Sequence, residues 1–215
     1  MSRVFITGVS GFMGRRLAAK LAARGHEVRG LVRSGSKARL ADGCERVTGD
    51  PLDASTYREY VRGCDTLVHL VGVAHPSPAK KQQFRSIDLA SATQAIAAAA
   101  ATGVRHLVYV SVAHPAPIMR EYIAARMEAE AAIGKAGLNA TILRPWYVLG
   151  PGRRWPLGIA PIYRLLEALP ATRDAARRLG LVSAEQMTAS LARAVEEPAS
   201  GVRVWEVPQI RLSLP

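Results

Sequence analysis

The sequence is poor in cysteine and in the residue clusters that bind metals. Its 215 residues include two cysteines, Cys44 and Cys64, and five histidines, and none of them follows the spacing of a zinc site or a disulfide framework. Each cysteine precedes a predicted strand, and those two strands are not neighbours in the sheet order inferred below. We therefore expect free thiols and no metal.

Long apolar runs and a leader are also missing. No apolar stretch reaches the length that crosses a bilayer, and the first residues do not combine a basic segment with an apolar one. Hydrophobic residues make up 49% of the chain and charged residues 21%, as in ordinary globular domains. We expect one domain over residues 1–215, without a membrane span and located in the cytoplasm.

Acidic residues are scarce relative to basic ones. The chain has 29 Lys and Arg against 17 Asp and Glu, which gives a net charge of +12. No nucleic-acid partner is expected, because no run of five Lys or Arg occurs and no aromatic residues interleave with basic ones. Residues 1–40 hold nine basic side chains and one acidic side chain, and so carry +8 of that charge. This concentration favours a polyanionic ligand nearby; a solvated basic helix face is the alternative.

A glycine-rich turn lies near the N-terminus. The apolar residues 4–6 are followed by Gly8, Gly11 and Gly14, and then at once by an amphipathic helix pattern. This is a variant of the dinucleotide fingerprint: the first glycine permits a tight turn, the second lets the backbone approach a pyrophosphate, and the third allows close helix packing. The phosphates would face the helix N-terminus. Glycines used for geometry alone are the alternative.

A basic residue stands where many dinucleotide folds have a carboxylate. A strand predicted over 27–32 ends at Arg33, which is followed by Ser34, Ser36 and Lys37. A carboxylate there accepts hydrogen bonds from a ribose 2′-hydroxyl, whereas a guanidinium pairs with a 2′-phosphate. The sequence therefore predicts NADP in preference to NAD, and a surface arginine at a strand end is the alternative.

The rest of the chain alternates short strands with helices. Further strands are predicted over 46–49, 66–70, 105–110, 140–143 and 201–205, and helices over 13–25, 79–102, 118–136, 171–180 and 184–196. This alternation predicts an α/β fold of Rossmann type, a three-layer doubly wound parallel sheet with the order 3-2-1-4-5-6, to which the last strand would add a seventh. Residues 146–180 contain Trp146, Tyr147, Trp155 and Tyr163, and we expect an irregular aromatic cap there.

Six motifs stand in the order of a known superfamily. They are TGVSGFMG at 7–14, GDPLD at 49–53, HLVG at 69–72, GVRHLVYVSV at 103–112, YIAARMEAE at 122–130 and LNATILRPWYVLGPG at 138–152. The chain resembles the short-chain dehydrogenase/reductase superfamily, in its atypical and extended branch of NAD(P)H-binding and epimerase/dehydratase-like proteins. Together, the fingerprint and the resemblance imply cofactor contacts from Gly8, Ser10, Gly11, Phe12, Met13, Gly14, Arg33, Asp50, Leu52, Val71, Gly72 and Pro145.

The resemblance also implies where catalysis takes place. Active members use a Tyr, a Lys four residues later on the same helix face, and a Ser after the fifth strand. The matching residues here are Tyr122, Arg126 and Ser111. An arginine can donate to the nicotinamide ribose and stabilise a tyrosinate, but it cannot lose a proton and so cannot relay one.

Two histidines offer a substitute for that proton relay. The sequence VAHP follows the fourth strand at 73–76 and the fifth strand at 112–115, and these strands are neighbours in the predicted order. We hypothesise that His75 and His114 approach the nicotinamide, and that one of them supplies an acid/base group near neutral pH. Ordinary loop histidines are the alternative.

These observations predict an NADP-dependent oxidoreductase that moves hydride between the cofactor and a small carbonyl or alcohol substrate, as a monomer or homodimer. The alternative is a protein that binds NADP(H) without turnover, as a redox sensor or as a structural or assembly subunit. The replacement of the family's lysine by Arg126 is what keeps this alternative open.

Overall fold

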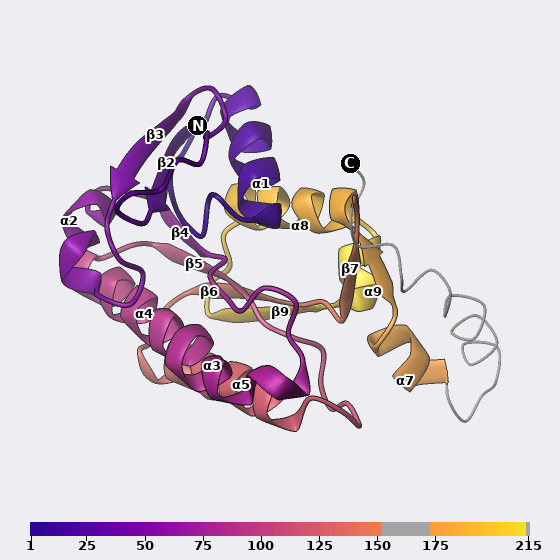
Figure 1. The fold of residues 1–215 in the computed structure, drawn as a ribbon. Coiled ribbons are helices and arrows are strands. Elements are labelled where there is room, and N and C mark those ends of the chain that lie inside the picture. Colours follow the sequence, from indigo (N-terminus) through magenta and orange to yellow (C-terminus); the bar gives the residue numbers. More distant parts are fainter. Residues whose placement is uncertain (152–172, 214–215) are drawn as a thin grey trace.

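A seven-stranded parallel sheet forms the centre of the molecule (Figure 1). The computed structural model describes residues 1–151 and 173–213. In sheet order the strands are β3 (Cys44–Thr48), β2 (Glu27–Val32), β1 (Arg3–Thr7), β4 (Thr66–His69), β5 (His106–Val110), β6 (Ala140–Arg144) and β9 (Val202–Glu206). This order confirms the predicted doubly wound sheet, and β9 is its seventh strand.

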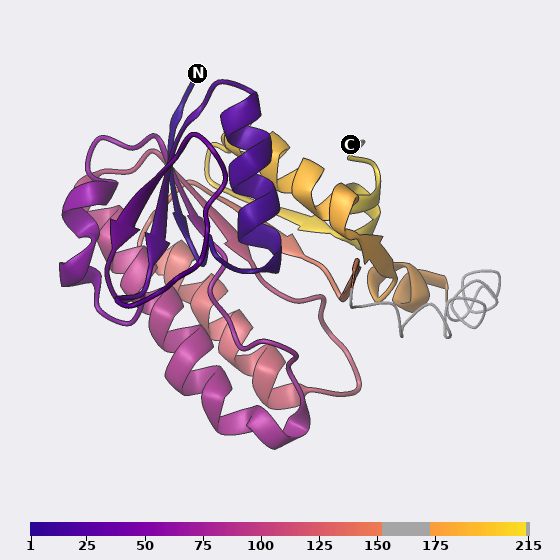
Figure 2. The ribbon, with the colours of Figure 1, turned by 45° about the horizontal axis from the view of Figure 1, so that its top comes forward.

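Helices cover both faces of this sheet (Figure 2). One face carries α1 (Phe12–Ala23), α8 (Ala184–Glu196) and α9 (Val207–Arg211), and the other carries α2 (Arg58–Val61), α4 (Ala90–Thr102) and α5 (Arg120–Lys135). Alternate side chains of a strand point to opposite faces. Accordingly Val4 and Ile6 pack with α1 and α8, whereas Phe5 packs with α2 and α4. Both faces are thus buried, as a parallel sheet requires.

The helix predicted over 79–102 is a continuous helical run made of four segments. They are η2 (Pro78–Lys80), α3 (Lys81–Gln83), the π-helical η3 (Phe84–Leu89) and α4. The alanines of α4 let it lie close to the sheet, and Gly103 ends it in the left-handed conformation with φ of 68°. A π-helical stretch is uncommon and often marks a functional region; this one lies beside the site described below.

Several elements differ from the sequence prediction. The third strand begins at Cys44 rather than Arg46. The Asp53 carboxylate caps a short helix, η1 (Ala54–Thr56), a role for which the sequence already made Asp53 a candidate. A second, two-stranded sheet pairs β7 (Tyr147–Leu149) with β8 (Leu181–Ser183), and it was not predicted. Within the expected cap, α7 (Arg173–Arg178) confirms a helix, whereas Trp155 and Tyr163 lie outside the described residues.

The sequence predicts no disulfide, no metal site and no membrane span, and the described residues give the following for each. Both cysteines are free thiols in this part of the chain. Residues 1–151 and 173–213 contain no group of three or more His, Cys, Asp or Glu arranged to hold a metal ion. Within the same ranges, every helix is too short or too polar to cross a membrane.

Candidate cofactor-binding site

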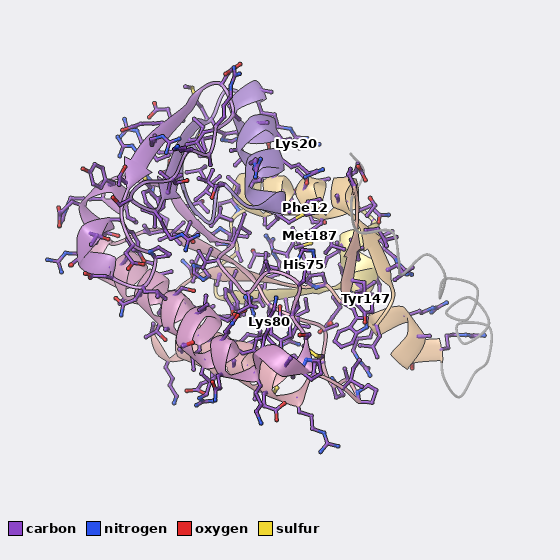
Figure 3. The ribbon with its side chains drawn as sticks, viewed as in Figure 1. Phe12, Lys20, His75, Lys80, Tyr147 and Met187 are labelled. Atoms are coloured by element: carbon purple, nitrogen blue, oxygen red, sulfur yellow. The ribbon has the colours of Figure 1, made fainter. Side chains whose placement is uncertain are left out.

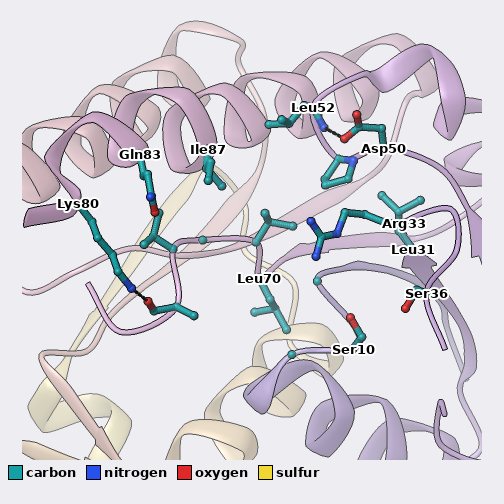
Figure 4. A pocket seen from close by; sticks show the side chains of 17 residues that line it. Ser10, Leu31, Arg33, Ser36, Asp50, Leu52, Leu70, Lys80, Gln83 and Ile87 are labelled. Atoms are coloured by element: carbon teal, nitrogen blue, oxygen red, sulfur yellow. Dashed lines mark hydrogen bonds between the residues drawn. The ribbon is translucent and has the colours of Figure 1, made fainter. Parts of the chain in front are cut away.

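A cavity of about 500 Å³ opens at the carboxyl edge of the sheet, where the strand order reverses between β1 and β4 (Figure 4). Its walls come from the turn after β1, the end of β2, residues 50–52, residues 70–74 after β4, and the start of the helical run. Ligands of doubly wound sheets bind at this switch point. The lining includes these predicted cofactor residues: Gly8, Ser10, Gly11, Arg33, Asp50, Leu52, Val71 and Gly72.

The turn after β1 is built by its glycines. Gly8 has φ of 74°, and a Cβ there would lie 2.9 Å from the Leu70 carbonyl carbon. The Gly11 N–H donates to the Gly8 carbonyl at 3.0 Å and so closes the turn. A Cβ on Gly14 would overlap that same carbonyl oxygen and the Val9 backbone. The turn is therefore tight enough that only glycine fits at positions 8 and 14.

The turn delivers the N-terminus of α1 to the cavity. Gly11 is the N-cap residue and has no side chain to satisfy the first N–H groups, and the first turn of α1 carries no acidic residue. Unsatisfied N–H groups and the helix dipole together attract anions. This geometry suits a pyrophosphate, as the glycine spacing predicts.

An arginine without a partner among the described residues lines one end of the cavity. Arg33 follows β2 and lines the cavity beside Ser36 and Leu31. Among the described residues, no hydrogen bond or ion pair engages the Arg33 guanidinium. Asp50, in contrast, already accepts the Leu52 N–H at 2.9 Å through one carboxylate oxygen. Arg33 is thus free to bind an anionic ligand at this end.

The remaining predicted cofactor residues lie beside the cavity rather than among its described lining. The Phe12 side chain lies at the start of α1 (Figure 3). Its ring packs on Gly150, where a Cβ would overlap it, and the Arg16 guanidinium lies 4.1 Å from the ring centre. Met13 packs against the α1 core. The Pro145 carbonyl accepts the Ala113 N–H at 2.9 Å, which joins the chain after β6 to the chain after β5.

Arg126 is buried next to the cavity wall. Its side chain is 7% exposed and forms an ion pair with Asp88, while its other donors reach the Val110 carbonyl at 2.8 Å and the Tyr109 hydroxyl at 3.4 Å. Burial opposes the charge, but Tyr122, Tyr109 and Asp88 together raise the pKa of Arg126 above its ordinary value. A Cβ on Gly72 would overlap the Arg126 guanidinium, so Gly72 is where the wall meets this pair.

Tyr122 lies one turn before Arg126 on α5. Its ring centre is 5.2 Å from the guanidinium carbon of Arg126 and 5.0 Å from the ring centre of Phe84. The structure therefore brings the predicted Tyr–Arg pair together on one helix face. It also shows that this arginine is held by an aspartate of the π-helical segment, a partner that the sequence pattern did not indicate.

Ser111 and His114 meet at a different carboxylate, Glu130. The Ser111 hydroxyl donates to Glu130, and His114 Nε2 lies 3.7 Å from Glu130 Oε1. Arg144 pairs with both Glu130 and, at 2.9 Å, Glu206. Glu130 follows Tyr122 and Arg126 at spacings of i+8 and i+4, so all three lie along one face of α5. That spacing was the signal available for Glu130, which the sequence prediction missed.

His75 lies in other surroundings. It is exposed, its backbone has φ of 51°, and its carbonyl oxygen accepts from Lys80 Nζ at 3.2 Å (Figure 3). The Lys80 ammonium also donates to the Ala74 carbonyl at 2.6 Å and so closes the loop after β4 (Figure 4). A joint role of His75 and His114 stays a prediction.

A third histidine is buried beneath the cavity floor. His69 ends β4 and shares hydrogen bonds with Thr7 at 2.9 Å and Ser91 at 3.4 Å, and its ring stacks on Tyr109. Burial, with a smaller contribution from the Arg126 charge, lowers the pKa of His69 from 6.5 to about 3. The ring is therefore neutral at physiological pH and ties the floor residue Leu70 to β1 and α4.

Comparisons with known proteins agree with this site. A family model described as NAD(P)H-binding matches residues 8–153. The ceramide reductase of Caulobacter vibrioides is 28% identical over 201 residues, which cover 93% of this chain and 62% of that protein. The 4-hydroxy-2-methyl-3-oxo-4-farnesyl-3,4-dihydroquinoline-1-oxide ketoreductase of Stigmatella aurantiaca is 29% identical over 170 residues, 69% of this chain and 51% of that protein. The chain thus spans between half and two thirds of these relatives.

A solved structure shares the fold. The enzyme WbmH of Bordetella bronchiseptica, in complex with NAD+, superposes with a TM-score of 0.71 at 20% identity, covering 96% of this chain and 75% of that one. The family match spans the glycine turn, Arg33, the loop after β4 and the Tyr122–Arg126 pair. The chain therefore belongs to the NAD(P)H-binding family, in agreement with the resemblance to the extended and atypical short-chain dehydrogenase/reductase superfamily.

Proposed function

We propose that the protein is an NADPH-dependent reductase that converts a carbonyl group of a small, largely apolar substrate to an alcohol. The observation that carries this proposal is Arg33, a cation without a partner among the described residues, at the end of β2 in a dinucleotide pocket. A guanidinium there would pair with a 2′-phosphate, which NADPH has and NADH lacks. No carboxylate occupies the end of β2 to favour NADH.

In this proposal, separate residues of the chain would bind the cofactor and transfer the proton. The N-terminus of α1 would hold the pyrophosphate, and Val71 and Gly72 would lie along the middle of the cofactor. Bound NADPH would supply a hydride to the carbonyl carbon. Tyr122 would donate the proton to the carbonyl oxygen, and the charge of Arg126, 5.2 Å from the ring centre, would stabilise the tyrosinate left behind.

The substrate class follows from aromatic surface and from the relatives. Trp146 and Tyr147 are partly exposed, and their ring centres are 5.5 Å apart. Tyr122 is also partly exposed and packs on the buried ring of Phe84. Such rings bury apolar area and leave one polar edge. The two curated relatives are named for a ceramide and for a farnesyl-bearing ketone, which supports an apolar substrate. We propose that residues 146–180 cap this end of the site within a single domain.

A second candidate function rests on how Arg126 is held. Two of its guanidinium nitrogens are engaged by Asp88, the Val110 carbonyl and the Tyr109 hydroxyl, which leaves few donors for a ribose. A protein that binds NADP(H) as a redox sensor or assembly subunit, without turnover, would need the cofactor pocket but no catalytic arginine with free donors.

Turnover separates the two candidates. Purified protein is mixed with NADPH or NADH and a panel of apolar ketones that runs from small ones to long-chain and isoprenoid ones, and the loss of reduced-nicotinamide absorbance is followed. The reductase proposal expects NADPH consumption that Tyr122→Phe lowers by about 10²–10⁴-fold, while Tyr60→Phe, an exposed tyrosine of α2, leaves it unchanged. Tight NADPH binding without consumption on any ketone would favour the sensor.

A further inference from the structure

The loop from residue 33 to residue 40, between β2 and β3, carries the cations nearest the adenosine end of the cavity. It turns sharply, with the Ser36 N–H donating to the Arg33 carbonyl at 3.0 Å and Gly35 at φ of 72°. Arg33 and Ser36 line the cavity, and Lys37 is exposed. An exposed loop with a glycine at its turn has many conformations available, and only some of them aim Arg33 and Ser36 at one phosphate.

A side chain from β3 holds this loop in place. Arg46 lies opposite Gly30 in the β2–β3 register, and its two terminal nitrogens donate to separate loop carbonyls. One bond reaches Ser36 at 3.2 Å, and the other reaches Ala38. The Ser36 hydroxyl in turn accepts the Ala38 N–H at 3.4 Å. The planar fork of arginine is suited to bridging two such acceptors.

We infer that Arg46 is a specificity-determining positioning residue, which fixes the loop so that Arg33 and Ser36 receive the 2′-phosphate of NADP(H). The inference rests on the proposed preference for NADPH and deepens it. A loop that is ordered before binding does not lose that conformational entropy when the phosphate arrives. Because NADH has no 2′-phosphate for Arg33 and Ser36 to bind, Arg46 affects the affinity for NADPH more than the affinity for NADH.

Arg46→Gln tests this inference against a charge-matched control. Lys37→Gln also removes one positive charge, here from the loop itself, and among the described residues Lys37 has no hydrogen bond or ion pair to lose. Calorimetric dissociation constants for NADPH and NADH are measured for wild type and both variants, with the melting temperature of each protein without cofactor. We expect Arg46→Gln to weaken NADPH binding about five- to tenfold, with NADH within about twofold, and Lys37→Gln to weaken NADPH by about twofold.

Three results would overturn the inference. Equal losses of NADPH affinity in the two variants would mean that Arg46 contributes only its charge. Equal losses of NADPH and NADH affinity in Arg46→Gln would mean that the residue supports the whole fold, and an unchanged NADPH affinity would mean that the tether has no role. The wild-type protein reports separately on the proposed function, because a wild type that binds NADH as well as NADPH contradicts that proposal whatever Arg46 does.

Discussion

The two ends of the site differ in how their polar groups are used. At the cofactor end, the α1 N-terminus has no side-chain cap and Arg33 has no partner among the described residues. At the end that we propose to be catalytic, called the catalytic end below, Arg126 is paired with Asp88, and Ser111 and Arg144 both bind Glu130. The cofactor end is therefore open to a ligand, whereas the charges of the other end are paired within the protein, with the buried Arg126 Nε and His114 Nε2 left without a hydrogen-bond partner. A ligand gains most where polar groups lack partners, because bonded groups must first be released.

The largest expected effect comes from removing the buried cation of the catalytic end. Arg126→Met leaves Asp88 buried without its cation, and the free energy of unfolding should fall by about 3–5 kcal/mol. Urea unfolding measures the change. Arg85→Met, which breaks an exposed pair with Glu128, is the matched control and should cost no more than about 1 kcal/mol. Equal losses in the two variants would mean that the Arg126–Asp88 pair does not stabilise this end.

The next largest effect comes from distorting the glycine turn of the cofactor end. Gly14→Ala places a Cβ on the Gly8 carbonyl oxygen, so the turn must shift. Overpacking of this kind costs about 1–3 kcal/mol, and NADPH affinity measured by calorimetry should fall by more than about tenfold. Gly134→Ala is the control: its Cβ in α5 would meet nothing within 4 Å, and it should stabilise the protein by about 0.5–1 kcal/mol. Full NADPH affinity in Gly14→Ala would contradict the structure of the turn.

Acidic pH should lower the stability of the protein through His69, which lies beneath the cavity. The folded protein holds the pKa of His69 at about 3 by burial, against an ordinary value of 6.5. Above pH 6.5 the ring is neutral in both states; below it the unfolded chain binds a proton that the folded chain cannot. Stability should therefore fall with pH between 6.5 and 3, by about 1.4 kcal/mol per pH unit for this residue. His106, with a pKa lowered to about 4 mainly by burial, adds a similar loss.

His69→Gln isolates the floor histidine. Its stability, from urea unfolding at several pH values, should decline less steeply than that of wild type below pH 6.5, and the two proteins should share one pH dependence above pH 7. The same slope in both proteins at acidic pH would show that His69 is not held neutral.

The smallest expected effect concerns Ser111. If its hydroxyl serves mainly to bind Glu130, Ser111→Ala should lower stability by about 1 kcal/mol, because Glu130 keeps its bonds to Arg144. Ser86→Ala, at an exposed hydroxyl that donates to the Gln82 carbonyl, is the control and should change stability by less than about 0.5 kcal/mol. A lower rate of ketone reduction without a loss of stability would instead show that Ser111 takes part in the reaction.

Local patterns were enough to predict the sheet and the cofactor end. The turn at Gly8–Gly14 and Arg33 are read from residues close in sequence, and strand order follows from handedness rules that hold for most such folds. The catalytic end depends on pairs far apart in the chain. Asp88 meets Arg126 across 38 residues and Arg144 meets Glu206 across 62, while β7 pairs with β8 so that Tyr147 lies opposite Leu181.

Some of these long-range pairs also follow from irregular local structure. The π-helical segment Phe84–Leu89 contains Asp88, and no periodic pattern in the sequence indicates that change of helical register. Tyr122, Arg126 and Glu130 could be placed on one helix face from their spacing, but their partners come from other elements. Spacing shows which residues share a face, and only the assembled fold shows what each of them contacts.

The comparison of the two ends is tested most directly by the affinities of the wild-type protein and of Arg33→Gln for NADPH and NADH, measured by calorimetry. The account predicts that wild type binds NADPH at least about tenfold more tightly than NADH. Arg33→Gln should lose most of that ratio through weaker NADPH binding, while Arg105→Gln, an exposed arginine 82% accessible just before β5 at the opposite edge, keeps it. Equal wild-type affinities for the two cofactors, or a ratio unchanged in Arg33→Gln, would contradict the account.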